Sequence, residues 1–476
     1  MKISKLVSKI ECLYIGKNNN PVFKVKEDSR KIERGDIFIT HAGARTHAIE
    51  SEKKGASVIV TPCFIKNIST SQIIGDTSKL KKDIIQNLYV DELENIKVVG
   101  ITGTDGKTTT SMLTNNIINE SNKSACIGTL GIQGSQINIK TSLTTPVSSD
   151  LANSLKKLRM NNHQYAVIEC SSHGLFQDRI DPIKLHAAAM NRVTRDHLDF
   201  HGNENYYFKA KSLIFSKLDD FSPAIINSSC PSLQKLQKKY PKLQWITWGR
   251  ENADIVGRIV SKTVNKSVIE INLPNRRNLE IKTNLVGDFQ IENILASICL
   301  SYGLGISEED MVSGIKKLKN VPGRMEKINT EKRNVFIDYA HTPNAIKKSI
   351  KTLKTICKGK IFAVFGCGGD RDKGKRAQMA KAGLEADRLF ITSDNPRTED
   401  PKSIIKDMLS GIGNKVKELE VEIDRKKAIK NAIQSAKKED IVLIAGKGHE
   451  DYQLIGEKTI PHNDSLFAKE VLSTCA

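Results

Sequence analysis

Short apolar runs, flanked by turn residues and separated by segments of helical length, recur along the chain. Such runs are typical of strands that are buried on both faces of a sheet. They lie at 35–39, 55–60, 96–102, 165–168, 224–226, 335–338, 360–365, 388–392 and 440–445. The alternation of strand and helix predicts an α/β fold with mostly parallel sheets and crossover helices.

The length of 476 residues predicts about three domains, at roughly 150 residues per domain. Residues 1–93 hold short strand-like runs and predict a small N-terminal α/β domain. Residues 94–321 predict a central domain with a mostly parallel sheet and crossover helices. Pro322-Gly323 marks a break, and the strands that follow predict a Rossmann-like third domain over 322–476.

Composition excludes several other classes of protein. No apolar run is long enough to cross a bilayer, and Met1 to Gly16 lacks the apolar core of a signal peptide. The nine cysteines are scattered without a CxxC pair, which disfavours a disulfide framework or a zinc site. The net charge of +20 is spread along the chain, so a solvated basic surface that attracts anionic substrates is favoured over a nucleic-acid interface.

The strongest local motif follows the apolar run at 96–102. It reads Gly103-Thr104-Asp105-Gly106-Lys107-Thr108-Thr109 and precedes a segment with a helical pattern. Glycines let the backbone approach a phosphate, and exposed N–H groups at a helix N-terminus favour an anion. Lys107 can neutralise the outer phosphates, and the Thr108 hydroxyl can bind Mg²⁺. Ile101 stands where a strict P-loop has glycine, so a shorter GxxGKT loop is predicted.

A second group of polar residues follows the run at 165–168. Glu169 ends that predicted strand, and a carboxylate at the carboxyl end of a parallel strand lies beside a ligand crevice. Cys170 is interpreted as a small buried residue, and the segment Cys170–Gly174 does not match the GxSxG elbow of hydrolases. In the segment Asn191–Gly202, His197 could coordinate a cation, although spacing alone leaves this open.

Together these motifs resemble the Mur ligases, and they occur in that family's order. The resemblance is carried by the phosphate loop and by Glu169–Gly174, Arg195–Asp199, Ala210-Lys211, Pro322–Glu326 and Asp338–Pro343, and it extends from about Asp28 to near the C-terminus. It implies a UDP-binding domain, a central ATPase domain and a C-terminal Rossmann-like domain. It also implies an ATP-dependent ligase that forms an amide bond through an acyl phosphate.

The resemblance implies a role for individual residues. Gly103–Thr109, Asn293, Arg324 and Asp338 would bind ATP, with Asp105 standing where the family usually has Asn. Lys107, Glu169, His197 and Lys211 would be catalytic, and Mg²⁺ would be held by Thr108, Glu169, His197 and a carbamylated Lys211. The UDP-muramoyl dipeptide would contact Ser29, Arg30, Thr144, Thr145, Ser171, Ser172, Gln177 and Arg179.

The amino acid that is added is implied by three further segments. Asp394-Asn395-Pro396-Arg397 resembles the motif of the members that add meso-2,6-diaminopimelate to UDP-N-acetylmuramoyl-L-alanyl-D-glutamate. Arg397 could form a bidentate pair with the distal carboxylate, a group that lysine lacks. Arg371, Gly446 and Glu450 would complete the pocket, with Glu450 suited to the distal ammonium. The implied protein is a cytoplasmic monomer that acts in peptidoglycan synthesis and binds neither nucleic acid nor membrane.

Two alternatives stay open at this point. The chain could add lysine, or could be a related glutamate-adding ligase, although Arg397 argues against lysine. It could also be a basic P-loop protein that binds nucleic acid. That function would need clustered cations with stacking aromatics, whereas aromatic residues make up only 5% of the chain.

Overall fold

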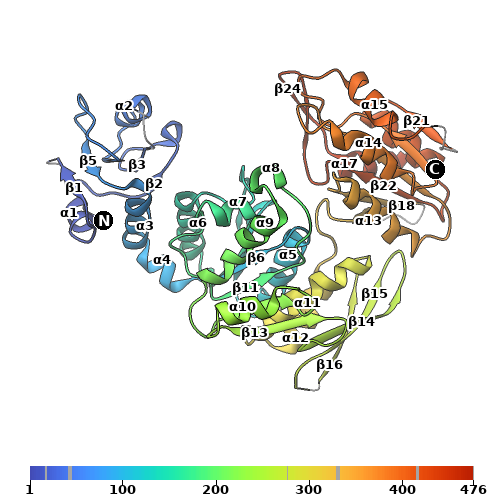
Figure 1. Cartoon of the computed structure of the whole chain (residues 1–476), viewed down its shortest axis with the longest axis horizontal. Coiled ribbons are helices and arrows are strands. Elements are labelled where there is room, and N and C mark those ends of the chain that lie inside the picture. Colours follow the sequence, from blue (N-terminus) through green and yellow to red (C-terminus); the bar gives the residue numbers. More distant parts are fainter. Residues whose placement is uncertain (17–18, 41–44, 276, 329–332, 414–417, 475–476) are drawn as a thin grey trace. The chain divides into compact units, whose positions relative to one another are not determined.

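The computed structural model describes residues 1–16, 19–40, 45–275, 277–328, 333–413 and 418–474 (Figure 1). Contacts among these residues divide the chain into two compact units. One unit comprises Met1–Val256, Leu273–Asn275 and Asn293–Gly314, and the other comprises Gly257–Asn272, Arg276–Glu292 and Ile315–Ala476. The predicted α/β class is confirmed, while the boundaries predicted at 93/94 and 321/322 stay predictions. No helix in the described part of the chain is long and apolar enough to span a membrane.

The N-terminal sheet has the strand order β1-β5-β4-β3-β2 and is parallel except for β1. One face packs on α1 and α3, and residues of the opposite face, such as Phe38 and Ile59, pack with Ala48 of α2. Its strands are β1 (Leu13–Ile15), β2 (Val25–Lys26), β3 (Ile37–Ile39), β4 (Val58–Thr61) and β5 (Ser71–Ile74). Its helices are α1 (Ile3–Val7), η1 (Ser29–Lys31), α2 (Arg45–Lys53), α3 (Thr77–Leu88) and α4 (Val90–Asn95).

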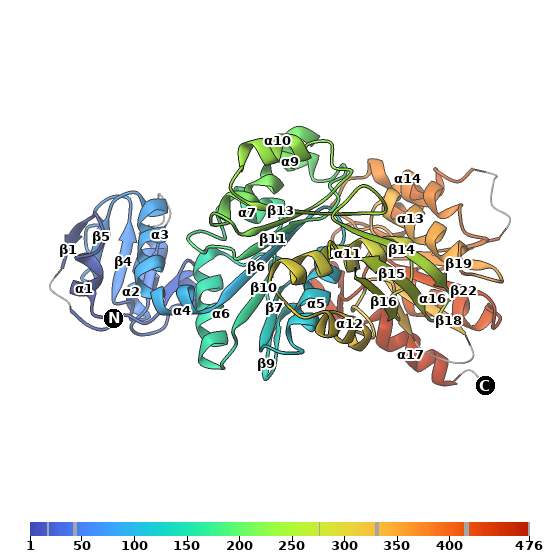
Figure 2. The same ribbon diagram turned by 90° about the horizontal axis from the view of Figure 1, so that it is seen from below.

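The central sheet has the order β16-β15-β14-β13-β12-β11-β6-β10-β7-β8-β9 (Figure 2). It is parallel from β14 to β7, with antiparallel pairs at both ends. The strands are β6 (Lys97–Thr102), β7 (Ser124–Gly128), β8 (Gly131–Gly134), β9 (Ile137–Ile139), β10 (Tyr165–Glu169), β11 (Ala187–Met190), β12 (Pro223–Asn227), β13 (Gln244–Gly249), β14 (Ile255–Lys262), β15 (Ser267–Asn272) and β16 (Asn278–Thr283). The associated helices are α5 (Lys107–Ile118), α6 (Ser148–Met160), α7 (Ser172–Phe176), α8 (Leu198–His201), α9 (Glu204–Ser212), η2 (Leu213–Lys217), α10 (Leu233–Lys239), α11 (Asp288–Gly303) and α12 (Glu308–Lys317).

Strand β6 lies at the point where the strand order of the central sheet reverses. After β6 the chain forms β7 and β10 on one side of it, and then β11 and β12 on the other. In open α/β sheets, ligands bind in the crevice at the carboxyl ends of the strands at such a switch point. The topology therefore places the end of β6, and the motif that follows it, where a ligand crevice is expected.

The C-terminal sheet has the order β17-β18-β22-β19-β20-β21 and is parallel except for β17. Its strands and the adjacent hairpin are β17 (Glu326–Ile328), β18 (Asn334–Asp338), β19 (Ile361–Phe365), β20 (Arg388–Ile391), β21 (Leu419–Val421), β22 (Ile441–Ala445), β23 (Tyr452–Ile455) and β24 (Lys458–Pro461). Its helices are α13 (Pro343–Lys354), α14 (Gly374–Gly383), α15 (Pro401–Leu409), α16 (Arg425–Ser435) and α17 (Asp464–Thr474).

Both faces of the C-terminal sheet are covered by helices, which explains its continuous apolar strands. In β22, Ile441 and Leu443 pack with the helices α13, α14 and α15. Val442 and Ile444 pack on the opposite face with α16 and α17. Because side chains alternate between the two faces of a strand, a strand buried on both sides must be apolar at every position.

Candidate active site

The predicted phosphate loop connects the buried strand β6 to the helix α5. Gly106 caps the helix with φ 81°, a left-handed conformation that favours glycine. A Cβ at Gly106 would lie 2.2 Å from Asn293 Oδ1 and 2.8 Å from Asn191 Nδ2, so the loop tolerates no side chain there. The loop thus presents the N-terminus of a helix of ordinary length at the switch point, as an anion site requires.

Two lysines donate to the same carbonyl oxygen of this loop. Lys107 Nζ lies 2.9 Å from the oxygens of Gly103 and Thr104, and Lys211 Nζ lies 2.7 Å from the oxygen of Gly103. Lys211 is buried and forms no salt bridge among the described residues, although the charges of Asp196 and Asp105 act on its amine. Burial, reinforced by the nearby charge of Lys107, lowers the pKa of Lys211 well below its ordinary value. The structure therefore places two amines on one carbonyl oxygen of the loop, and burial favours the neutral form of Lys211.

Glu169 ends β10, the strand that pairs in parallel with β6, so its carboxylate reaches the same edge of the sheet. Its Oε2 accepts hydrogen bonds from the Thr108 hydroxyl at 2.9 Å and the Thr129 hydroxyl at 3.1 Å. Its Oε1 accepts the Thr129 N–H at 2.9 Å. Gly128 makes room for this carboxylate, because a Cβ there would lie 2.1 Å from Glu169 Oε1.

The pair formed by Thr108 and Glu169 has the chemistry of a Mg²⁺ site. Hydroxyl and carboxylate oxygens are hard ligands, and Mg²⁺ is commonly held by one or two such groups together with substrate phosphates. Within the part of the chain that the structure describes, no group of three His, Cys, Asp or Glu residues could hold a metal ion alone. The donors present thus fit a Mg²⁺ ion that completes its shell with phosphate and water.

His197 lies in a segment that is tied to the phosphate loop. The Thr104 hydroxyl donates to the Thr194 carbonyl at 3.0 Å and accepts the Thr194 N–H at 2.9 Å. His197 itself is exposed, has φ 49°, and lies 3.5 Å from Asp196 through Nε2. Its ring packs edge-on against His173 at 5.0 Å between centroids. The structure brings its segment to the loop, and its role as a metal ligand stays a prediction.

The residues predicted to bind the muramoyl dipeptide form a connected network beside Glu169. The Thr145 hydroxyl donates to the Glu169 backbone oxygen at 2.8 Å and accepts the Ser171 N–H at 2.9 Å. Arg179 donates to the Thr145 oxygen at 3.1 Å and to the Gln177 side chain at 2.6 Å. The network also includes Thr144, whose hydroxyl lies 3.2 Å from that of Thr129. Ser172 is buried in the first turn of α7, which begins directly after Ser171.

Ser29 and Arg30 belong to a separate polar cluster in the N-terminal sheet region. The buried Ser29 donates to Glu50 at 2.6 Å, and the exposed Arg30 pairs with Asp28 at 2.9 Å. Lys54 Nζ donates to the backbone oxygens of both residues, at 3.2 and 3.1 Å. Arg30 thus presents a guanidinium at the surface, as a contact to an anionic ligand would need.

The remaining residues predicted to bind ATP lie in two regions. Asn293 of α11 is buried, and its Oδ1 accepts a 3.4 Å hydrogen bond from Thr110 next to the phosphate loop. In the other unit, Arg324 lies over the Tyr339 ring, 4.6 Å from its centroid. Asp338 ends β18 and accepts the Ser349 hydroxyl at 2.6 Å and the Tyr339 N–H at 2.9 Å. Burial raises the pKa of Asp338 despite these bonds.

The residues of the predicted amino-acid pocket lie on three loops. These loops follow the carboxyl ends of β19, β20 and β22, which are neighbours in one sheet. Arg397 donates to the Gly369 oxygen at 2.7 Å and has φ 52°. Its guanidinium has no carboxylate partner among the described residues. A Cβ at Gly369 would lie 1.9 Å from the Pro396 oxygen, so glycine is needed for the loops to meet. Arg371 is exposed in the first of these loops.

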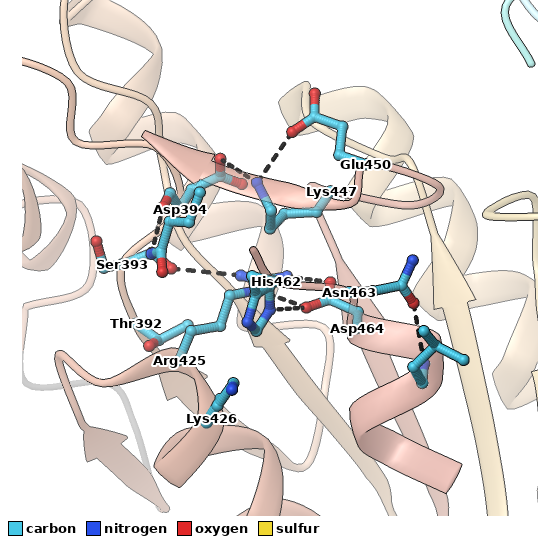
Figure 3. Close-up of polar contacts among 12 residues, drawn as sticks. Thr392, Ser393, Asp394, Arg425, Lys426, Lys447, Glu450, His462, Asn463 and Asp464 are labelled. Carbon is cyan, nitrogen blue, oxygen red and sulfur yellow. Dashed lines mark hydrogen bonds and ion pairs between the residues drawn. The ribbon is translucent and has the colours of Figure 1, made fainter. Parts of the chain in front are cut away.

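The loops after β20 and β22 are joined by polar contacts (Figure 3). The amide of Asn395 donates to Glu450 Oε2 at 3.1 Å, and Lys447 contacts both residues. Figure 3 shows the contact between Lys447 and Glu450. Gly446 has φ 108°, and a Cβ there would lie 2.7 Å from Asp394 Oδ2. The structure therefore brings together Asp394, Asn395, Pro396, Arg397, Gly446 and Glu450, as predicted from the three segments.

Sequence reasoning missed several residues that shape these sites. Asn191 reaches the phosphate loop, where its Nδ2 donates to Thr110 at 2.9 Å. Below the amino-acid pocket, a buried Arg425 pairs with Asp464 at 2.6 Å, and Asp464 also contacts His462 at 2.7 Å (Figure 3). Asn191 lies in a segment that was singled out for its acids and histidines, whereas nothing local marks the pairing of Arg425 with Asp464.

The interpretation of the cysteines is consistent with their surroundings. Cys170 is buried, and burial raises the pKa of its thiol to about 12. A thiol that stays protonated is a poor nucleophile, so Cys170 fits a packing role. The cysteines of the described residues are free thiols, as expected from their spacing.

Two family models match the chain in consecutive segments. The Mur ligase middle domain matches residues 101–301, and the Mur ligase glutamate ligase domain matches residues 323–448. The first match begins at the phosphate loop, and the second spans the loops of the C-terminal sheet.

Full-length relatives and solved structures agree with these matches. The chain is 35% identical over 99% of its length to the whole UDP-N-acetylmuramoyl-L-alanyl-D-glutamate–2,6-diaminopimelate ligase of Clostridioides difficile. A solved structure of a ligase with the same name superposes with a TM-score of 0.70 at 30% identity, over 99% of both chains. The MurF ligase of Thermotoga maritima in complex with ADP, at 21% identity, has the same fold with a TM-score of 0.67 over 90% of this chain and 94% of that one.

Proposed function

The chain belongs to the Mur ligase family, and from this premise we propose that it adds meso-2,6-diaminopimelate to UDP-N-acetylmuramoyl-L-alanyl-D-glutamate with the use of ATP. The product is an amide, so the protein is an amide-bond-forming ligase. The observation that carries the choice of amino acid is the Arg397 guanidinium, which donates to backbone oxygens at the carboxyl edge of the C-terminal sheet. Such a group suits the distal carboxylate of diaminopimelate by bidentate hydrogen bonds.

In the proposed reaction, the terminal carboxylate of the dipeptide first attacks the γ-phosphorus of ATP. A C–O–P linkage forms, the bond to the β-phosphate oxygen breaks, and ADP leaves. Lys107 and the N–H groups at the start of α5 stabilise the charge on the transferred phosphoryl group. The amine of diaminopimelate then attacks the acyl carbon, and phosphate leaves as the amide forms.

The dipeptide is positioned by the network beside Glu169. Arg179 and the hydroxyls of Thr144, Thr145, Ser171 and Ser172 offer directed donors to its carboxylates and amides. Ser29 and Arg30 are proposed to hold the uridine diphosphate end. Arg371, Asp394, Asn395, Gly446 and Glu450 are proposed to surround the amino acid, with Glu450 toward its distal ammonium.

Thr108, Glu169 and His197 are proposed to hold Mg²⁺ together with Lys211 after its carbamylation. When bound, Mg²⁺ would offset negative charge on the phosphates. The lowered pKa of Lys211 supports the modification, because the neutral amine is the form that can attack carbon dioxide, lose a proton and become a carbamate. Asn293 is proposed to lie on the adenine side of ATP, and Arg324 and Asp338 are proposed to contact the nucleotide.

The proposed reaction assigns the protein to peptidoglycan precursor synthesis, and through it to cell-wall biogenesis, cell shape and cell division. We propose a cytoplasmic monomer, since ATP and a nucleotide-linked precursor are both expected there. No nucleic-acid or membrane partner is part of this proposal.

The deciding experiment is an amino-acid selectivity assay. Purified protein is given ATP, Mg²⁺ and the UDP-muramoyl dipeptide, and phosphate release is measured with diaminopimelate or with lysine. We expect release with diaminopimelate and little with lysine. Phosphate release with lysine but not with diaminopimelate would contradict the proposed amino acid. Salt-sensitive DNA binding without any precursor-dependent ATPase would contradict the whole assignment.

A further inference from the structure

A buried lysine lies at the base of the amino-acid pocket and has no role in the function proposed above. The side chain of Lys447, which follows β22, is 0% exposed. Its ammonium lies 2.9 Å from Glu450 Oε2, 3.0 Å from Asn395 Oδ1 and 4.0 Å from Asp394 Oδ1. Figure 3 shows the contacts of Lys447 with Glu450 and Asp394. A buried charge is costly unless it is paired and hydrogen-bonded. These contacts therefore stabilise the charge of Lys447 and at the same time restrict the positions of the side chains around it.

Lys447 fixes the orientation of the Asn395 amide. Asn395 Oδ1 accepts from Lys447 and from the Leu454 N–H at 2.9 Å, while Asn395 Nδ2 donates to Glu450 Oε2 at 3.1 Å. A flipped amide would point its NH₂ group at the two donors. With Lys447 present, only one orientation of Asn395 is satisfied.

Lys447 and Asn395 also hold Glu450 by a single carboxylate oxygen. Both donate to Oε2, and among the described residues no hydrogen bond reaches Oε1 from another side chain. Figure 3 shows this second oxygen pointing away from Lys447. The contacts therefore leave one oxygen of a fixed carboxylate for a ligand.

The charges of Asp394, Glu450 and Lys447 sum to one negative charge, and the Arg397 guanidinium of the same pocket is assigned above to a carboxylate. Asp394 and Glu450 are acidic, and Lys447 lies within 4.0 Å of both. Below them, the charge of Arg425 is matched by Asp464 at 2.6 Å. A surplus of one negative charge matches a single ammonium group of an incoming amino acid, whereas loss of Lys447 would leave two.

The backbone that carries these side chains is held independently of Lys447. Arg425 donates to the Ser393 backbone oxygen at 3.5 Å and to the Ala445 backbone oxygen at 2.9 Å. Ser393 immediately precedes Asp394 in the chain, and Ala445 immediately precedes Gly446. Removal of the lysine should thus release side chains in the pocket while the two loops stay in place.

We propose that Lys447 is a positioning residue for the amino-acid substrate, because its ammonium fixes Glu450 and Asn395 in the geometry that receives the substrate's distal ammonium. The proposal rests on the proposed function for the identity of that substrate. In this role Lys447 acts through Glu450 and Asn395 and makes no contact with the reacting atoms.

The test is a KM and kcat comparison of the parent enzyme with Lys447→Met. We expect the KM for diaminopimelate to rise about tenfold or more, as for the loss of a charged hydrogen bond, with kcat changed less than about threefold. The KM values for ATP and for the precursor should stay unchanged. Lys430→Met, which replaces an exposed lysine of α16, is the matched control and should change none of them.

A double variant separates positioning from a merely structural role. If Lys447 acts through Glu450, adding Lys447→Met to Glu450→Gln should raise the KM for diaminopimelate little further. The proposal would be overturned if the rise in KM of the double variant equalled the product of the rises in the two single variants. It would also be overturned by an unchanged KM in Lys447→Met. A variant that loses thermal stability while all KM values stay at the parent level would also overturn it. If Lys447→Met fails to fold, Lys447→Gln, which keeps a donor without the charge, is measured in the same way.

The proposal and the proposed function can fail separately. A parent enzyme that releases phosphate with lysine but not with diaminopimelate refutes the proposed substrate. The KM ratio of Lys447→Met to parent is then measured with lysine, which also carries a distal ammonium. A ratio near one overturns the role of Lys447, and a ratio of about ten supports it.

Discussion

The phosphate loop and the amino-acid pocket each have a buried lysine, Lys211 and Lys447, and the two sites use their lysines in opposite ways. At the phosphate loop, Lys107 and Lys211 donate to the same backbone oxygen of Gly103. In the pocket, Lys447 pairs with the side chains of Glu450 and Asn395. Carbonyl oxygens satisfy hydrogen bonds without neutralising charge, whereas a carboxylate does both. The phosphate loop is thus suited to an anion, whereas the amino-acid pocket offers one surplus negative charge to an ammonium group and the Arg397 guanidinium to a carboxylate.

The largest effect expected is on the first of these sites. Lys107→Ala should lower precursor-dependent ADP release by about 10³-fold, because charge on the transferred phosphoryl group loses its partner. Circular dichroism and thermal unfolding should match the parent. Lys209→Ala, an exposed lysine of α9, serves as the control. Turnover of Lys107→Ala at the parent level would contradict the role of Lys107 in stabilising the transferred phosphoryl group.

A large effect on stability is expected from the ion pair below the pocket. Arg425→Met should lower the free energy of unfolding by about 3 kcal/mol, because Asp464 is left buried without its main partner. Urea unfolding followed by circular dichroism measures the change. Lys427→Met, an exposed neighbour on the same helix, should cost far less. Equal stability of Arg425→Met and the parent would show that the pair contributes little to holding the loops.

The pair of Arg425 and Asp464 also predicts how the free energy of unfolding depends on pH, and the sign of this dependence should change in Arg425→Met. Arg425 holds the pKa of Asp464 below its ordinary value of 3.8, although burial alone would raise it. The pair therefore stabilises the parent above about pH 4, and this contribution is lost as the pH falls further. In Arg425→Met the buried carboxylate favours its protonated form, so stability should instead rise as the pH falls toward 4. Unfolding curves at several pH values test this, and slopes of the same sign would contradict it.

A smaller effect is expected on selectivity in the pocket. Arg397→Lys should reduce the preference for diaminopimelate over lysine by about tenfold to a hundredfold, because a lysine cannot form the bidentate pair with a carboxylate. The ratio of kcat/KM for the two amino acids is the measurement. Preference at the parent level would show that another group reads the distal carboxylate.

The smallest effect is expected where Thr104 ties the phosphate loop to the segment of His197. Thr104→Val removes the hydroxyl that bonds both the N–H and the oxygen of Thr194, and should cost about 1–2 kcal/mol of stability. The KM for ATP should rise severalfold at most. Thr247→Val, which removes a hydroxyl bond to Asp254 outside the loop, is the control and should leave that KM unchanged.

The fold class and the place of the phosphate loop could be read from the sequence. Apolar runs predicted at 96–102, 165–168 and 440–445 correspond to β6, β10 and β22. Their continuous apolarity follows from burial on both faces, which is a local and periodic signal. The loop residues Gly103–Thr109 lie between a strand and a helix, as their order in the chain required.

Only the tertiary structure decided which polar groups meet. Lys211 reaches the oxygen of Gly103 across 108 positions of sequence, and Arg425 reaches Asp464 across 39. A lysine in an ordinary helical pattern carries no local mark of burial, because its surroundings are supplied by strands from elsewhere in the chain. Periodicity along the sequence thus determined the layers of this protein, whereas long-range packing selected the partners of its buried charges.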